Sequence, residues 1–186
     1  ATPRDIDRLV RADLIVANGL HLEGKLAELL ERIGRKRPFV AVGEAVPQDE
    51  LLPIGNGLFD PHIWFDAKLW SYCPFAVADA LIQLDSEASS HYQQRAEKYS
   101  KDLLELDENV RKKFNGIPRQ RRVLITAHDA FRYFGRAYGL EVIGVQGTST
   151  ESEAGLADMN QLVDLVVRRR IPAVFRSEEH TSELQS

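Results

Sequence analysis

Three histidines stand in similar settings in this sequence, each just after a predicted strand or where a loop leads into a predicted helix. They are His21 in segment 18–23, His62 in segment 60–66 and His128 in segment 126–131. Neutral imidazole is a favoured ligand for zinc, manganese and iron, and a nearby carboxylate can orient the ring through its other nitrogen. The carboxylates placed in sequence to do so are Asp60, Asp66 and Asp129. The pattern indicates a transition-metal site, although a set of capping or core histidines fits the spacing about as well.

The predicted strands and helices place all three histidines near the carboxyl ends of strands. Short β-branched runs alternate with helical patterns, which predicts parallel βαβ units with helices on both faces of the sheet. Strands are expected at 14–17, 39–42, 123–126, 142–145 and 173–175, and helices at 4–10, 24–33, 66–84, 130–137 and 158–169. In open α/β sheets, ligands bind outside the carboxyl ends of the strands, and all three histidines are expected to project there.

One long helix is predicted to interrupt this alternation at residues 86–116. Apolar side chains recur along it in steps of three and four, and its length corresponds to roughly 40 Å at 1.5 Å per residue. Asp85 or Ser86 can cap its start, and Gly116 followed by Pro118 ends it. A coiled coil is less well supported, because Tyr and Ala occupy the seam where Leu and Ile would be expected.

A helix of this length crosses more than one compact domain, so we place a domain boundary along it. The expected organisation is an N-terminal α/β lobe at 1–85, the connecting helix at 86–116 and a C-terminal α/β lobe at 117–175. Leu103 and Leu106 are expected to pack against the lobes. His91 has no partner in sequence and is expected on the solvated face of the helix.

The far end of the sequence needs a separate interpretation. Residues 176–186 have no apolar period, and a common sequencing-adapter text can encode them. We therefore interpret them as a translated adapter and leave them out of the fold and the site, together with His180. At the other end the sequence opens without an initiator Met or a signal peptide, so it is expected to be a piece of a longer protein, truncated at both ends.

Composition excludes several classes of function. The net charge of −4 provides no basic patch of the kind that binds nucleic acid through its phosphates. No apolar run approaches the roughly 20 residues that a membrane-spanning helix needs. Cys73 is the only cysteine, which rules out an internal disulfide and argues against a thiolate metal site. It is expected to be a small core residue.

Taken together, the segments around the three histidines resemble the cluster-9 metal-binding receptors of bacterial ABC importers, the zinc and manganese solute-binding family. The segments that carry the resemblance are 12–23, 60–66, 127–134 and 137–139, and it runs over essentially all of residues 1–175. It implies an α/β fold with two lobes of parallel sheet flanked by helices and joined by one long rigid helix. In that family the metal is held in the cleft between the lobes.

The resemblance also implies a ligand set. His21 and His62 would be ligands from the first lobe and His128 a ligand from the second. The family's usual fourth ligand, an Asp late in the second lobe, would lie beyond Phe175. Dedicated zinc receptors often carry histidines before the second ligand, and segment 44–58 has none. The expected bound ion is therefore Mn²⁺, with Zn²⁺ a close second and Fe²⁺ a further alternative.

The implied function is that of the substrate-binding component of an importer. It would capture the ion in the periplasm or at the outer face of the cytoplasmic membrane and deliver it to a permease with its ATPase subunit. A monomer is expected, and contact with the membrane only through an N-terminal lipid anchor. An enzyme is not expected, yet a zinc-dependent hydrolase with a three-histidine site stays open, with Glu23 as the nearest general base. An adhesin or interaction lipoprotein is the other alternative.

Overall fold

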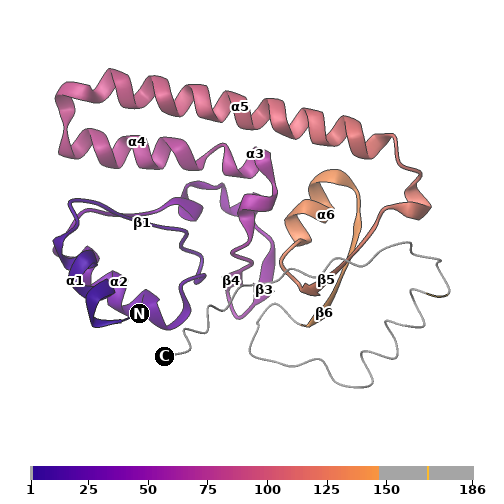
Figure 1. Cartoon of the computed structure of the whole chain (residues 1–186), viewed down its shortest axis with the longest axis horizontal. Coiled ribbons are helices and arrows are strands. Elements are labelled where there is room, and N and C mark those ends of the chain that lie inside the picture. Colours follow the sequence, from indigo (N-terminus) through magenta and orange to yellow (C-terminus); the bar gives the residue numbers. More distant parts are fainter. Residues whose placement is uncertain (1, 147–166, 168–186) are drawn as a thin grey trace, which may run out of the picture. The chain divides into compact units, whose positions relative to one another are not determined.

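The computed structural model describes residues 2–146 and residue 167, and Figure 1 shows the elements that they form. The chain divides into two compact units, residues 1–111 and residues 112–186. The predicted strand at 173–175 and the segment 176–186, with His180, lie outside the described residues. The predicted helix at 158–169 does too, except for Val167, which is helical.

The first unit begins with a parallel βαβ arrangement. Its elements are α1 (Pro3–Arg11), β1 (Ile15–Ala17), a 3-10 turn (Gly24–Leu26), α2 (Ala27–Gly34) and β2 (Phe39–Ala41). Strands β1 and β2 pair in parallel, with Ile15 opposite Phe39. Ile15 packs with Leu30 and Ile33 of α2 in a buried cluster, because those two residues share one face of the helix. This core fixes the end of β1, where segment 18–23 begins.

A short hairpin that the sequence did not predict follows β2. Two 3-10 turns (Val42–Ala45 and Gln48–Glu50) lead into the antiparallel strands β3 (Pro53–Gly55) and β4 (Leu58–Phe59). Gly55, Asn56 and Gly57 have φ values of 96°, 52° and 74°, and positive φ at the centre is typical of a tight hairpin. Neither strand contains a run of β-branched residues, and β3 carries Pro53 and Gly55, which strands disfavour.

The predicted helix at 66–84 is two helices, so that prediction was wrong. Helix α3 (Ala67–Trp70) and helix α4 (Cys73–Leu84) are separated by Ser71 and Tyr72. Pro74 lies in the first turn of α4, where its missing N–H costs nothing. In the interior of one continuous helix the same ring would clash with the carbonyl of the preceding turn. Pro74 therefore favours a fresh start over a continuation.

The long helix is confirmed as α5 (Ser89–Asn115), which has 27 residues. A 3-10 turn (Ser86–Ala88) precedes it, and the Asp85 carboxylate accepts a hydrogen bond from the Ala88 N–H at 3.3 Å. Asn115 is its last helical residue, ahead of Gly116, as predicted. Most of α5 belongs to the first unit, and its last turn belongs to the second.

One stripe of α5 is buried. It consists of Ala96, Ser100, Leu103 and Asp107, at steps of four, three and four residues. Leu103 is 7% exposed, which confirms that it packs, but Leu106 is 49% exposed, so the prediction for Leu106 was wrong. Leu106 lies about 100° around the helix from Asp107, off the stripe.

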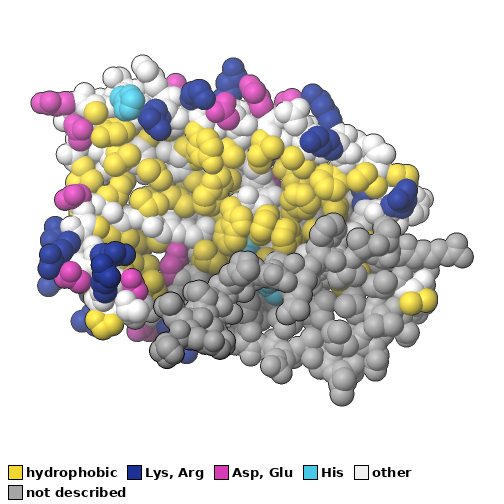
Figure 2. All heavy atoms as spheres, in the orientation of Figure 1, with side chains coloured by type: hydrophobic (Ala, Val, Ile, Leu, Met, Phe, Trp, Pro, Cys, Tyr) yellow, Lys and Arg dark blue, Asp and Glu magenta, His cyan; other side chains and the backbone are white. Residues whose placement is uncertain are grey.

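The outer face of α5 is charged. Lys98 pairs with Asp102 at 3.0 Å and Lys101 pairs with Glu105 at 3.8 Å, both one helical turn apart. Figure 2 shows basic and acidic side chains interspersed along this helix, and His91 is exposed on it as predicted. No helix in the described part of the chain is long and apolar enough to cross a membrane.

The second unit repeats the parallel βαβ pattern. After a 3-10 turn (Arg119–Arg121) come β5 (Val123–His128), α6 (Arg132–Tyr138) and β6 (Glu141–Gln146). The two strands pair in parallel. Gly135 of α6 is required by this packing, because a Cβ there would lie 2.5 Å from Cγ2 of Val142 on β6. Gly139 ends the helix with φ 71°. Helix α6 therefore packs closely against β6, and β5 ends at His128.

Candidate metal centre

His62 is held by a carboxylate two residues away. Asp60 is fully buried and His62 is 7% exposed. Oδ1 of Asp60 accepts a hydrogen bond from the His62 backbone N–H at 3.0 Å and lies 2.7 Å from Nδ1 of the ring. A carboxylate accepts, so in the neutral ring the proton sits on Nδ1, and Nε2 is then the nitrogen that carries a lone pair. This is the partner arrangement that metal-binding histidines usually show, and it confirms the prediction that Asp60 can orient His62.

Asp66 caps a helix in the same segment. Its Oδ1 accepts a hydrogen bond from the Leu69 N–H at 3.2 Å and so caps α3. Asp66 is 6% exposed. The acidic residue that was predicted as an orienting partner therefore fixes the helix that follows His62.

His21 lies on a left-handed turn after β1. Gly19, Leu20 and His21 have φ values of 76°, 53° and 64°, and positive φ is uncommon for residues other than glycine. Oε1 of Glu23 accepts hydrogen bonds from the backbone N–H of Asn18 at 2.8 Å and of Gly19 at 3.2 Å. Glu23 thus closes the turn that presents His21. The sequence reasoning missed this role, and the only available signal was an Asn-Gly pair with a glutamate five residues after the Asn.

The His21 side chain is exposed and borders a small hollow. The hollow has a volume of about 230 Å³, and its polar lining includes His21, Glu23, Glu31 and Glu44. His21 therefore differs from His62, which is nearly buried and paired with a carboxylate.

One side chain joins the loops that carry these two histidines. Nδ2 of Asn18 donates to the backbone carbonyl of Gly19 at 3.0 Å and to that of Pro61 at 3.1 Å. Pro61 directly precedes His62. The end of β1 and the His62 segment are thus tied together, although 43 residues separate them in sequence.

His128 is the last residue of β5, the carboxyl-end position that was predicted for it. It is half-buried and stands opposite Gln146 in the parallel ladder. Its carbonyl accepts hydrogen bonds from the Thr126 hydroxyl at 2.9 Å and from the Ala130 N–H at 2.9 Å. Oδ2 of Asp129 lies 3.8 Å from Nε of Arg132.

The structure assigns the three histidines to different parts of the chain. His21 and His62 belong to the first unit and His128 to the second. Within residues 2–146, no group of three or more His, Cys, Asp or Glu side chains is gathered closely enough to hold a metal ion. The three-histidine site stays a prediction.

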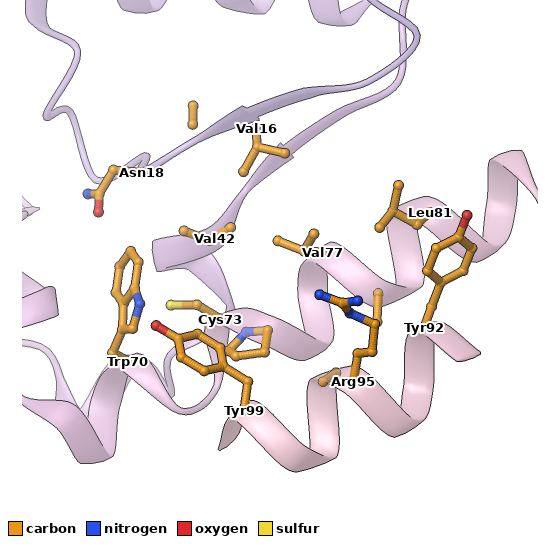
Figure 3. Close-up of a pocket in the computed structure, with 14 residues that line it drawn as sticks. Val16, Asn18, Val42, Trp70, Cys73, Val77, Leu81, Tyr92, Arg95 and Tyr99 are labelled. Atoms are coloured by element: carbon orange, nitrogen blue, oxygen red, sulfur yellow. The ribbon is translucent and has the colours of Figure 1, made fainter. Parts of the chain in front are cut away.

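A larger hollow in the first unit is unsuited to metal. It encloses about 500 Å³ between β1, α4 and α5, and it is lined mostly by apolar side chains. Figure 3 shows Trp70, Tyr99, Val77 and Leu81 facing it. Its one thiol, Cys73, is buried as predicted, and burial raises the pKa of Cys73 to about 12. A protonated thiol is a poor metal ligand.

Comparison with known proteins identifies the family of this chain. Residues 1–185 match the ZnuA family model, described as the periplasmic component A of a zinc-uptake complex. The chain is 47% identical over 175 residues to the zinc-binding protein TroA of Treponema pallidum, and 43% identical over 176 residues to the manganese-binding lipoprotein MntA of Bacillus subtilis. Each alignment covers 94% of this chain. The chain therefore belongs to this family of metal-binding receptors of ABC importers.

A solved structure confirms the fold class. The periplasmic zinc binding protein TroA from Treponema pallidum superimposes with a TM-score of 0.89 at 46% sequence identity, covering 95% of this chain and 64% of that one. The fold is thus the predicted α/β receptor type with a long helix. The chain spans 57% of the length of the TroA sequence and 58% of that of MntA.

Proposed function

We propose that this chain is the metal-capturing part of the substrate-binding component of a bacterial ABC importer. Its cargo is a divalent transition-metal ion, captured in the periplasm or at the outer face of the cytoplasmic membrane and delivered to a permease and its ATPase subunit. The family membership supports this role, as do the names of the zinc-binding and manganese-binding relatives. The observation that carries the proposal is the contact of 2.7 Å between the His62 ring and the buried Asp60 carboxylate.

His62 is the ligand for which the described contacts give the strongest support. The Asp60 carboxylate holds one ring nitrogen and restricts rotation of the ring, so Nε2 is prepared for an ion. We propose His128 and His21 as further ligands, on the chemistry of imidazole and on the family resemblance. Three imidazoles form a donor set that suits zinc, manganese and iron.

We propose manganese as the physiological cargo and zinc as its competitor. Segment 44–58 contains no histidine; it forms a 3-10 turn and the β3–β4 hairpin. A chain without extra nitrogen donors beside the site has less means of favouring zinc. Zinc nevertheless binds most nitrogen and oxygen sites more tightly than manganese does, so affinity in vitro and cargo in the cell need separate measurements.

The role of Glu23 favours binding over catalysis. A zinc hydrolase needs a general base beside an open coordination position, and Glu23 was the nearest candidate. Its Oε1 instead accepts two backbone N–H groups of its own loop. The adhesin alternative is compatible with metal capture and stays a prediction, as does the monomeric state.

Calorimetric titration of the full 186-residue chain with Zn²⁺ and Mn²⁺ tests the proposal. The variants His62→Ala, His128→Ala and His21→Ala each remove one proposed ligand, and His91→Ala is a matched control on the exposed face of α5. Removal of a ligand should weaken binding by more than the roughly 10–100-fold that loss of an outer partner costs. The control should bind as the parent does.

Each outcome has a distinct meaning. If His62→Ala binds as tightly as the parent, the proposed site is wrong. If His62→Ala and His128→Ala weaken binding while His21→Ala does not, His21 leaves the ligand set and the receptor role stands. Circular dichroism of each variant shows whether the fold is intact.

A further inference from the structure

The backbone of Asn18 is fixed by two separate elements. Its N–H donates to Oε1 of Glu23 at 2.8 Å, and its carbonyl accepts from the Gly43 N–H at 2.8 Å. Gly43 permits this approach, because a Cβ at that position would lie 2.7 Å from the Asn18 carbonyl oxygen. The side chain of Asn18 therefore starts from a backbone held on both sides.

The Asn18 amide can face its partners in one orientation only. Both groups in contact with its nitrogen are carbonyl oxygens, those of Gly19 at 3.0 Å and Pro61 at 3.1 Å. A flipped amide would direct its own oxygen at two acceptors, so the NH₂ group must lie there. Oδ1 is buried and has no hydrogen-bond partner among the described residues. The amide is thus held by its donor end alone.

The Pro61 carbonyl is the point at which Asn18 reaches the His62 segment. The same oxygen accepts from the Ile63 N–H at 2.9 Å, so it closes the turn around His62. On the other side of the turn, the Asp60 N–H donates to the Leu52 carbonyl at 2.8 Å. The peptide between Pro61 and His62 is therefore fixed to β1 through Asn18, while Asp60 fixes the ring.

We propose that Asn18 is a positioning residue for His62, acting through the Pro61 carbonyl. This inference rests on the proposed role of His62 as a metal ligand. Without the Asn18 donor, the Pro61–His62 peptide can rotate, and rotation there moves the backbone that carries the imidazole. An ion then binds to a ring whose position is no longer set in advance, and part of the binding free energy is lost in ordering it.

Two substitutions separate this role from others. Asn18→Leu keeps the approximate size of the side chain and removes both hydrogen bonds. The leucine side chain suits this position, because Asn18 borders the apolar hollow beside Val42 and Trp70 (Figure 3). Asn18→Asp removes the donors and adds a negative charge. A purely electrostatic effect of that charge would strengthen cation binding, whereas loss of positioning weakens it. Asn109→Asp, on the exposed face of α5, is the control for charge.

The experiment measures Zn²⁺ affinity by calorimetry and the visible absorption spectrum of bound Co²⁺, which reports coordination geometry. Both Asn18 variants should bind about 10-fold more weakly and show a changed Co²⁺ spectrum, while the control matches the parent. If Asn18→Leu does not fold, Asn18→Asp alone decides.

Folded Asn18 variants with the affinity and spectrum of the parent would overturn the inference, even if their melting temperature falls, because Asn18 would then serve only stability. His62→Ala, measured in parallel, separates the two proposals. If His62→Ala binds Zn²⁺ as tightly as the parent, the proposed function itself has failed. If only His62→Ala weakens binding, the ligand is right and the positioning role is wrong.

Discussion

At the scale of single residues, Asp60 and His62 form a compact unit of donor and acceptor. One oxygen of Asp60 contacts both the backbone N–H and the ring of His62, at 3.0 and 2.7 Å. The spacing of two residues is what makes this double contact feasible, since the chain only has to turn once at Pro61. Asp60 was predicted as a partner because it lies close to His62 in the sequence.

Asp60→Asn tests how much this contact contributes to metal binding. The amide keeps the shape of the carboxylate but lacks its charge, so it makes His62 a weaker and less well oriented ligand. We expect Zn²⁺ affinity to fall about 10–100-fold, measured by calorimetry. Asp102→Asn, which removes an exposed partner of Lys98, is the control and should not change affinity. Equal affinity for Asp60→Asn and the parent would show that the carboxylate does not tune the ligand.

The reactivity of Cys73 tests whether this thiol is buried in the first unit. Burial raises the pKa of Cys73 to about 12 because it disfavours the charged thiolate. At pH 8 almost all of the Cys73 thiol is then protonated, so a disulfide reagent such as DTNB should react very slowly with the native chain. After unfolding, the pKa of a free cysteine is about 8.5 and reaction should be fast. Rapid reaction in the native state would contradict the buried position.

At the scale of elements, those with a clear apolar run or repeat were predicted, and those without one were not. The parallel strands of both units were predicted from short runs of β-branched and other apolar residues, and helix α5 was predicted because apolar side chains repeat over several of its turns. The hairpin β3–β4 was missed because Pro53 and Gly55 are residues that strands disfavour, and neither strand contains a run of β-branched residues. The break between α3 and α4 was missed because apolar residues continue across Ser71 and Tyr72, and only Pro74 marks the new start.

The same reasoning explains what was missed at the site. Residue types and spacing pointed to His62 and Asp60, which interact locally. Asn18 and Glu23 act through backbone groups, and Asn18 reaches a carbonyl 43 residues away. A backbone carbonyl has no signature in the sequence, so such a contact becomes visible only once the fold is known.

Leu103 and Leu106 on α5 form a matched pair for a stability test. Leu103 is 7% exposed and Leu106 is 49% exposed. Leu103→Ala leaves a cavity and should lower the free energy of unfolding by about 2–5 kcal/mol. Leu106→Ala should change it by no more than about 0.5 kcal/mol, as for most surface substitutions. Urea unfolding curves compare the two, and equal midpoints would mean that the buried stripe of α5 does not stabilise the fold.

At the scale of the whole molecule, the family assignment and the parallel βαβ units agree. Residues 1–185 match the family model, and both described units contain a pair of parallel strands connected through a helix. The helix α5 contributes residues to both units. The receptor role that we propose requires ligands from distant parts of this one chain to bind a single ion.

The most direct test of that claim is X-ray absorption spectroscopy of the full chain loaded with one equivalent of Zn²⁺. The account predicts imidazole nitrogen ligands at about 2.0–2.1 Å from the metal. It also predicts that the number of imidazoles falls by one in His62→Ala, and again when His128→Ala is added. A coordination shell of oxygen atoms alone, or one that is the same in the parent and in His62→Ala, would contradict the account.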